Sequence, residues 1–596
     1  MIKIIKKINF PILCIVICTI FCIIPALNLM KFIPGHDSNF HLSRILFIEN
    51  ALKNLKIPTY ISCYDEINYA DSILYPSLFL NIPSFINLFT KNLYVSANIF
   101  RIIIIISSFI ICYKSINIII KDSFYSSIFT IIYNLNFYTL FNIYDRDALG
   151  EVIALVFIPL LIAGIYSLYV DKNTNENIYT IALTCILQSH IITFYYVLIF
   201  LIIFNFLMIR IIFKKKILKN IIKANFAFLL LNIWFIVPFL DYYKDGILYF
   251  TQDNVLQIAY VSTFKNLFGA FEEVMFYNTA NHYGFEHIVI YILTFIMLIC
   301  LPKISKGNDI NKDEYNIALL SFILFNFYFI FTFKNPLLDI LLKIDIIKTI
   351  YTKQQIPLRI IGRTLIFLII SFTLSLKIFF DHVSKYSIKV IKYLAIIILC
   401  IVHIFLNYHY INEKVKVANN YNNEFNIYVI TTYPDYKIYD KNEDKNKYIS
   451  KTTKQDFDFK EVYKSDNVII KTYERNYLDI NVEYEIEDYN NEKDYFIDLP
   501  FINYKYFSAK DNDSNINTYY GSHDNNIRLK INNKNGMISV TFKPPIIWLL
   551  SKWISILTII IIFRKYIYKR LYLSILYISK LYKNIKLFIT KIILKK

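Results

Sequence analysis

The feature that most constrains this chain is a series of uninterrupted apolar runs, most of them about 20 residues long. A helix of that length spans about 30 Å, the thickness of the hydrocarbon core of a bilayer. Of the 596 residues, 56% are hydrophobic, which is more than a soluble protein of this size can bury. The sequence therefore predicts a polytopic α-helical membrane protein.

We expect about 12 transmembrane helices, with both termini in the cytoplasm. The first run follows three lysines but lacks a small-residue cleavage site, so we interpret it as a retained span rather than a signal peptide. The expected spans are residues 10–30, 94–113, 123–143, 151–170, 178–192, 193–213, 224–240, 286–302, 314–334, 358–380, 391–407 and 546–563.

The segment 76–91 decides the orientation, because counting it as a span would reverse every later loop. It is apolar but short, and Pro83 interrupts it. With 12 spans, lysine-rich loops such as 214–223 lie in the cytoplasm, as the positive-inside rule requires. We therefore expect 76–91 to be a juxtamembrane or re-entrant helix within a long outer loop, 31–93.

The predicted domains are a transmembrane domain, 1–407, an extracytoplasmic β-rich domain, 408–545, a last transmembrane helix, 546–563, and a basic cytoplasmic tail, 564–596. The tail could lie on the inner leaflet as an amphipathic helix or remain a solvated segment.

Alternating hydrophobicity is the reason for expecting β structure in the outer domain. Residues 478–486 alternate with period two. Residues 527–531 and 538–542 do so as well, and the Asn535-Gly536 pair between them predicts a β-hairpin.

Charge and cysteine content exclude two classes of protein. The net charge of +19 comes from basic residues beside apolar spans, so we expect a lipid bilayer rather than a nucleic acid as partner. None of the eight cysteines lies in 408–545 and no CxxC pair occurs, which argues against a disulfide scaffold.

The first outer loop carries Asp37, His41 and Arg44, spaced i, i+4 and i+7. On a helix these side chains share one face. A carboxylate, an imidazole and a guanidinium near the membrane could bind a metal or an anionic head group, or move a proton. The alternative is a solvated helix face with a local Asp–His pair.

The second outer loop, 144–151, holds four charged residues between two apolar spans, and they include Arg146 and Glu151. Glu151 begins a span, where ionisable groups are costly and tend to be functional. An internally paired Arg–Glu cap would also explain these charges.

Two further polar residues lie at the outer ends of spans. His190 occupies a tight turn, where an interfacial histidine is the common case, and Arg359 precedes span ten. An outer arginine needs a partner, which could be a phosphate or a carboxylate such as Glu151 or Asp147. The predicted topology places all these clusters on the outer face. Polar residues with unrelated structural roles would not need to share one face.

The polar segments resemble the GT-C superfamily of membrane glycosyltransferases, and more closely the bacterial 6-pyruvoyl-tetrahydropterin synthase-related and YfhO-like membrane proteins. The outer β segment before a last span also fits the YfhO-like layout. The similar segments are His36-Asp37 with Phe40-His41-Leu42 and Arg44-Ile45, Leu74-Tyr75-Pro76-Ser77-Leu78, Tyr144 to Glu151, Gln188-Ser189-His190, Trp234 to Pro238, and Pro357-Leu358-Arg359.

This resemblance implies a GT-C fold and a polyprenyl-phosphate-sugar donor used on the outer face. It implies Asp37 as the acidic catalytic position, Arg146 and Glu151 as second-loop site residues, and His190 and Arg359 as positions near the cavity. One departure is Asp147, where a small residue, usually glycine, is expected.

The expected function is therefore an inverting sugar transfer to a cell-envelope glycan, lipid or protein. Asp37 would act as general base or would hold a divalent metal ion, Mg²⁺ or Mn²⁺. His41, Arg44, Arg146, Glu151, His190 and Arg359 are the candidate substrate-binding residues. The alternative is a non-catalytic protein for lipid or polymer transport, or for envelope assembly.

Overall fold

The structure is a computed structural model that describes most of the chain. The described residues are 10–56, 60–64, 67–170, 176–244, 285–304, 311–333, 335–352, 359–382, 388–420, 462–521 and 526–564. The predicted basic tail lies almost entirely outside them.

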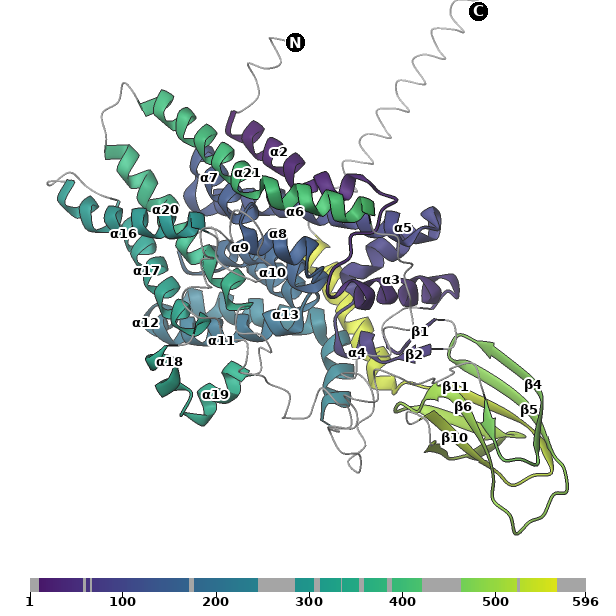
Figure 1. Cartoon of the computed structure of the whole chain (residues 1–596). Helices are drawn as coiled ribbons and strands as arrows, with labels where there is room; N and C mark the ends of the chain where they lie inside the picture. Colours follow the sequence, from purple (N-terminus) through teal and green to yellow (C-terminus); the bar gives the residue numbers. More distant parts are fainter. Residues whose placement is uncertain are drawn as a thin grey trace, which may run out of the picture.

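Helices make up the larger part of the molecule, and the strands gather at one end (Figure 1). Eight helices in the described residues are long and apolar enough to cross a membrane. They are Phe10–Leu27, Leu93–Ile120 (α6), Leu149–Tyr169 (α9), Lys216–Tyr243 (within α13), Lys312–Thr332 (α17 and a 3₁₀ turn), Ile360–Asp381 (within α20), Val390–Asn420 (within α21) and Ile546–Arg564.

These eight helices coincide with eight of the predicted spans, and they are compatible with the predicted membrane-protein class. Three other predicted spans correspond to shorter apolar helices, and the span 123–143 is broken in two. The shorter helices are α10 (Glu176–Leu187), α11 (Ile191–Leu207) and α16 (Phe285–Ile304), and the broken span forms α7 (Ser123–Asn134) and α8 (Phe137–Tyr144).

Capping explains the break between α7 and α8. The side chain of Asn136 accepts a hydrogen bond from the backbone N–H of Thr139 at 2.8 Å, which begins a new helix there. The segment 76–91 contains α5 (Asn81–Thr90), whose ten residues span only about 15 Å. That length is half of the hydrocarbon core.

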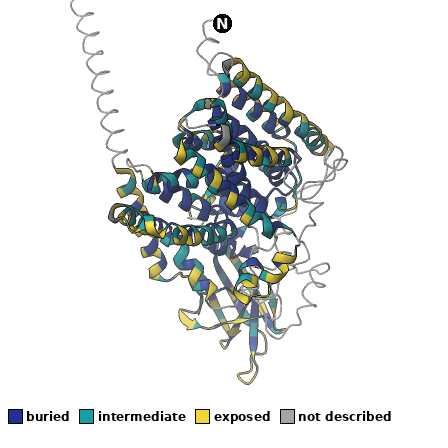
Figure 2. Ribbon diagram, turned by 90° about the vertical axis from the view of Figure 1, so that its left-hand side faces the viewer, coloured by how far each residue is buried: buried dark blue, intermediate teal, exposed yellow. Residues whose placement is uncertain are grey.

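The most buried long helices are α9 and α20, each with 72% of its apolar window inside the molecule, against 22% for α21. Figure 2 shows buried residues through the middle of the helical region and exposed ones on its outer helices. The exposed side chains of α21 include Ile398, Ile401 and Phe405, which is typical of a lipid-facing surface. The two central helices contribute Glu151 and Arg363 to the site described below.

Helix α21 (Ile388–Asn420) continues beyond the end predicted at residue 407. Its last turns are polar, so hydrophobicity alone did not reveal them. They bring Tyr410 and Lys414 to the carboxylate of Asp145 in the second outer loop.

The predicted β-rich region is confirmed by two antiparallel sheets that share one apolar core. One has the order β3-β6-β10-β9 and the other β4-β5-β11-β7-β8. The strands are β3 (Tyr463–Lys464), β4 (Val468–Asn476), β5 (Asp479–Ile486), β6 (Tyr495–Ile502), β7 (Phe507–Asp511), β8 (Ser514–Ile516), β9 (Thr518–Tyr520), β10 (Asn526–Ile531) and β11 (Asn535–Phe542).

The predicted hairpin at Asn535-Gly536 is wrong, because β10 and β11 belong to different sheets. Gly536 lies inside β11 opposite Tyr484. A Cβ on Gly536 would come within 2.3 Å of the Asp511 carboxylate, which accepts a hydrogen bond from the Tyr484 hydroxyl. Gly536 therefore leaves space for the hydrogen-bonded side chains of Tyr484 and Asp511, and it does not form a turn.

The β sandwich rests on the segment predicted to be the first outer loop, which forms α3 (Ser38–Lys53), the two-stranded sheet of β1 (Ser62–Tyr64) and β2 (Ile67–Tyr69), and α4 (Asp71–Leu74). The side-chain amide of Asn68 exchanges hydrogen bonds of 3.0 and 2.8 Å with the backbone of Ile502. The hydroxyl of Tyr242, near the end of α13, donates to the carbonyl of Lys505. The two regions are therefore in direct contact.

Candidate functional site

The two loops that carry the predicted site residues, both predicted to lie outside, are in contact with each other. The backbone N–H of His36 donates to the carbonyl of Asp145 at 2.9 Å, and that of Asp37 to the carbonyl of Arg146 at 2.8 Å. The backbone thus holds Asp37 beside the charged second loop, as their shared face suggested.

Asp147, the departure from the expected small residue, has a left-handed backbone with φ of 51°. Glycine adopts that conformation readily, and aspartate is among the few other residues that do. Arg101 from α6 binds the Asp147 carboxylate through Nη2 at 2.7 Å and Nε at 3.2 Å. Ser38 adds a third hydrogen bond of 2.6 Å, so this carboxylate is satisfied without Arg146.

Arg146 and Glu151 form a buried ion pair, with Nη1 and Oε2 3.0 Å apart. Asn142 accepts a second bond from Arg146 at 2.6 Å, and the Tyr138 hydroxyl donates to Oε1 of Glu151 at 2.5 Å. Arg359 reaches the same carboxylate, with Nε 3.3 Å from Oε2. The structure therefore gives Arg359 the carboxylate partner that was the alternative to a phosphate.

Asp37 differs from the other carboxylates of these loops because 38% of its side chain is exposed. Its Oδ2 lies 3.8 Å from Nη2 of Arg146, too far for a hydrogen bond. Burial raises the pKa of the Asp37 carboxyl above its usual value, and the nearby Arg146 and Arg359 partly oppose that change. Asp37 is thus accessible and only loosely paired.

Arg44 does not join this group, although it was predicted on the same helix face as Asp37. The residue Asp37 is the N-cap of α3, and the guanidinium of Arg44 is buried. Its Nε lies 2.8 Å from the Asp71 carboxylate, and its Nη2 donates to the carbonyls of Tyr75 and Pro76. Arg44 therefore connects α3 to α4 and the chain after it.

The two histidines both lie close to the ring of Tyr75. The ring centroids of His41 and His190 are 6.1 and 5.8 Å from that of Tyr75. Burial and the charge of Arg44 lower the pKa of His41 well below its usual value, so this ring is neutral at pH 7. His190 caps α11, where its Nδ1 accepts from the backbone N–H of Thr193.

Sequence analysis missed three groups that complete the arrangement: Arg101, Tyr138 and Arg363. Arg363 lies one helical turn beyond Arg359 on α20, and its charge acts on Glu151. Both Arg101 and Arg363 interrupt long apolar runs in the sequence, which is itself a signal of function or pairing.

The surroundings of Asp37 do not fit a divalent cation. Its nearest charged neighbour is the guanidinium of Arg146, with the charge of Arg359 also acting on it. Within the described ranges, no group of three or more His, Cys, Asp or Glu side chains is placed to hold a metal ion.

No protein-family model matches the chain, and neither a curated protein nor a solved structure does. Its function must therefore be argued from its own residues.

Proposed function

We propose that the chain is a GT-C-type membrane glycosyltransferase that moves a sugar from a polyprenyl-phosphate donor to a cell-envelope acceptor. The observation that carries this proposal is Asp37, an accessible carboxylate at the edge of a buried group of arginines. The resemblance of its loop to the superfamily supplies the class of donor.

Asp37 serves as the general base in this proposal. Its carboxylate takes the proton of an acceptor hydroxyl while that oxygen attacks the anomeric carbon. The bond from the anomeric carbon to the phosphate oxygen breaks, and the electron pair leaves with polyprenyl phosphate, inverting the configuration. A pKa raised by burial makes the carboxylate a stronger base than an exposed aspartate.

The loops around Asp37 need rigidity for this chemistry, since a displacement of about 1 Å can cost a large part of the rate. Backbone pairing with residues 145 and 146 supplies it. The three charges that follow Tyr144 each have a separate partner: Asp145 has Lys414, Arg146 has Glu151, and Asp147 has Arg101.

The proposed topology has 12 spans, with both termini in the cytoplasm and residues 408–545 outside. The lysine-rich loops support it through the positive-inside rule. In this arrangement Asp37 and the β sandwich lie on the same, outer side. Because that sandwich contacts the first outer loop, it holds the acceptor in this proposal.

A donor-consumption assay tests the proposal. Purified full-length protein in liposomes receives polyprenyl-phosphate-linked glucose, mannose or N-acetylglucosamine with cell-envelope extract, and released polyprenyl phosphate is measured. We expect Asp37→Asn to lower the rate by about 10²–10⁴. Asp466→Asn, at an exposed position of the β region, is the matched control and should have no effect.

The assay also distinguishes the proposed enzyme from the alternative, a non-catalytic protein for lipid or polymer transport or for envelope assembly. If the wild-type protein consumes none of these donors, the enzyme proposal fails and the non-catalytic function replaces it. If Asp37→Asn keeps the wild-type rate, Asp37 is not the base.

A further inference from the structure

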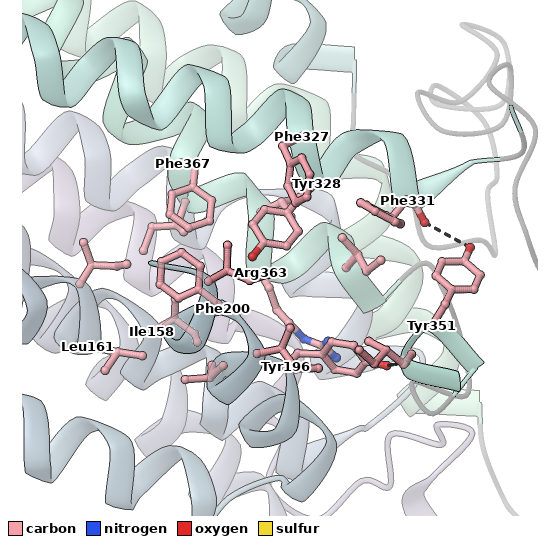
Figure 3. Close-up of a pocket in the computed structure, with 18 of the residues that line it drawn as sticks. Ile158, Leu161, Tyr196, Phe200, Phe327, Tyr328, Phe331, Tyr351, Arg363 and Phe367 are labelled. Carbon is pink, nitrogen blue, oxygen red and sulfur yellow. Dashed lines mark hydrogen bonds between the residues drawn. The ribbon is translucent and has the colours of Figure 1, made fainter. Parts of the chain in front are cut away.

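An apolar cavity of about 270 Å³ lies among α9, α11, α17, α20 and the short helix α19 (Asp345–Thr352). Its walls are isoleucine, leucine, phenylalanine and tyrosine side chains, including Ile158, Phe200, Tyr328 and Phe367 (Figure 3). Its volume equals that of about nine water molecules, yet such a lining offers water few partners. A cavity of this kind suits an apolar guest.

One charged side chain, Arg363, lines this cavity. Figure 3 shows it reaching from α20 toward Tyr196, and its guanidinium carbon lies 4.7 Å from the centre of that ring. All three guanidinium nitrogens are buried, and none has a hydrogen-bond partner in the described chain. A buried guanidinium without a bonded acceptor is costly, and the contact with one ring offsets only part of that cost.

The charges around Arg363 do not balance. The cluster of Asp37, Arg146, Glu151, Arg359 and Arg363 contains three guanidinium groups and two carboxylates, which leaves one positive charge in excess. Glu151 already contacts both Arg146 and Arg359. None of the described residues accepts a hydrogen bond from Arg363, so Arg363 is the member of this cluster whose donors are available to an added anion.

Two side chains of the cavity wall also reach the surface of the molecule. Ile203 on α11 and Phe327 on α17 both line the cavity, yet they are 37% and 46% exposed. Exposed apolar side chains on these helices face hydrocarbon in the proposed topology. The wall formed by α11 and α17 is therefore the side on which a guest from the bilayer would enter.

We propose that this cavity binds the chain of a long, single-chain lipid and that Arg363 binds its anionic head group, a phosphate ester. The inference rests on the proposed function for the choice of phosphate. It assigns the anion to Arg363 rather than to Arg359, whose guanidinium contacts Glu151. Residues Glu151 and Ile158 lie two turns apart on α9, so the head group would lie toward the charged cluster that includes Asp37.

Direct binding tests this site with defined probes. Tritiated hexadecyl phosphate is bound to the detergent-solubilised full-length protein, with hexadecanol and inorganic phosphate as competitors. We expect hexadecyl phosphate to bind at least about tenfold more tightly than either competitor, since only it supplies both chain and charge. Equal affinity for hexadecanol and hexadecyl phosphate would overturn the role of Arg363.

Two variants separate the chain from the charge. Arg363→Met keeps the length of the side chain. It should weaken the binding of hexadecyl phosphate roughly tenfold or more and leave the affinity for hexadecanol unchanged. Leu161→Trp fills the cavity and should weaken the binding of both lipids. Arg210→Met, at an exposed arginine of α12 (Ile209–Ile212), is the matched control and should bind like the wild type.

Folding and function can be told apart. Removing an unpaired buried charge should raise the thermal midpoint of the free protein, so a lower midpoint for Arg363→Met would mean a structural role and overturn the site. Hexadecyl phosphate binding without donor consumption would keep this inference and refute the glycosyltransferase. If Arg363→Met and Leu161→Trp leave donor consumption unaffected, the glycosyltransferase proposal is kept and this lipid site is refuted.

Discussion

Arg101 binds Asp147 through two nitrogens, with Nη2 2.7 Å from Oδ2 and Nε 3.2 Å from Oδ1, and both side chains are almost fully buried. The pair joins the first third of the apolar helix α6 to the loop that lies beside Asp37. It also removes the negative charge of Asp147 from the surroundings of Arg146. A residue that looked unfavourable beside a phosphate-binding arginine is instead part of the scaffold.

Arg101→Met should therefore destabilise the protein by about 3–5 kcal/mol, because it leaves a carboxylate buried with only Ser38 as hydroxyl partner. The double variant Arg101→Met/Asp147→Gly should recover most of that loss, since it removes both charges and glycine suits the left-handed backbone. Denaturant titration in detergent measures both free energies of unfolding.

The exposed pair of Lys223 and Glu176 is the matched control for this prediction. Lys223 is 65% exposed, so Lys223→Met should cost less than about 1 kcal/mol. Equal losses for Arg101→Met and Lys223→Met would show that the buried pair has no special role.

The length of the apolar runs predicted the helices well, because spans are long and lipid imposes one composition on them. The eight long helices all fall on predicted spans. The strands alternate as expected, but the pairing of β10 and β11 depends on which sheet each completes, and local turn signals do not encode that. Likewise, the polar end of α21 is fixed by its tertiary contact with Asp145.

The site was predictable in part for a similar reason. Short motifs located Asp37, Arg146 and Glu151, and the fold brings these together. Their neighbours Arg101 and Arg363 come from other helices, so only the fold reveals which charges they meet. The sequence does mark both, as single arginines within apolar runs, and that signal was stronger than helix-face spacing at Arg44.

The orientation of the chain can be tested by cysteine labelling. Ser514 is exposed on β8, and a cysteine there should react with a membrane-impermeant maleimide on intact cells. A cysteine at exposed Lys312, which begins α17 on the predicted inner side, should react only after lysis. The opposite pattern would invert the proposed topology.

Close packing of α20 against α8 positions the arginines. A Cβ on Gly362 would lie 2.2 Å from Cε1 of Tyr138, whose hydroxyl donates to Glu151. Gly362→Ala should therefore cost about 1–3 kcal/mol and reduce donor consumption, because α20 must move away with Arg359. Thermal unfolding and the donor assay measure the two effects.

Ser371→Ala on the same helix is the matched control for Gly362→Ala. It removes a buried hydroxyl without adding volume and should leave both readouts near wild type. Tyr138→Leu should restore part of the stability of Gly362→Ala by making space, although not its activity, since Glu151 then loses the hydroxyl. Additive losses in that double variant would contradict the proposed clash.

The protonation of Asp37 should change stability and activity in opposite directions as the pH rises. Burial raises the pKa of its carboxyl, so the folded state favours the protonated form. The resulting contribution of Asp37 to the free energy of unfolding is fully present below about pH 3.9, the ordinary pKa of aspartate. It is lost as the pH rises through the raised pKa of the folded state. Activity as a base needs the deprotonated form and should rise over that same interval.

Asp37→Asn should thus melt at or above the wild-type temperature at pH 7, and the difference should shrink as the pH falls toward 4. The effect will be small, because 38% of the Asp37 side chain is exposed to solvent. Donor consumption by the wild type should have an acid limb that lies above the ordinary aspartate value. A lower melting temperature for Asp37→Asn at pH 7 would instead mean that the ion pair with Arg146 outweighs desolvation, and Asp37 would then belong to the scaffold.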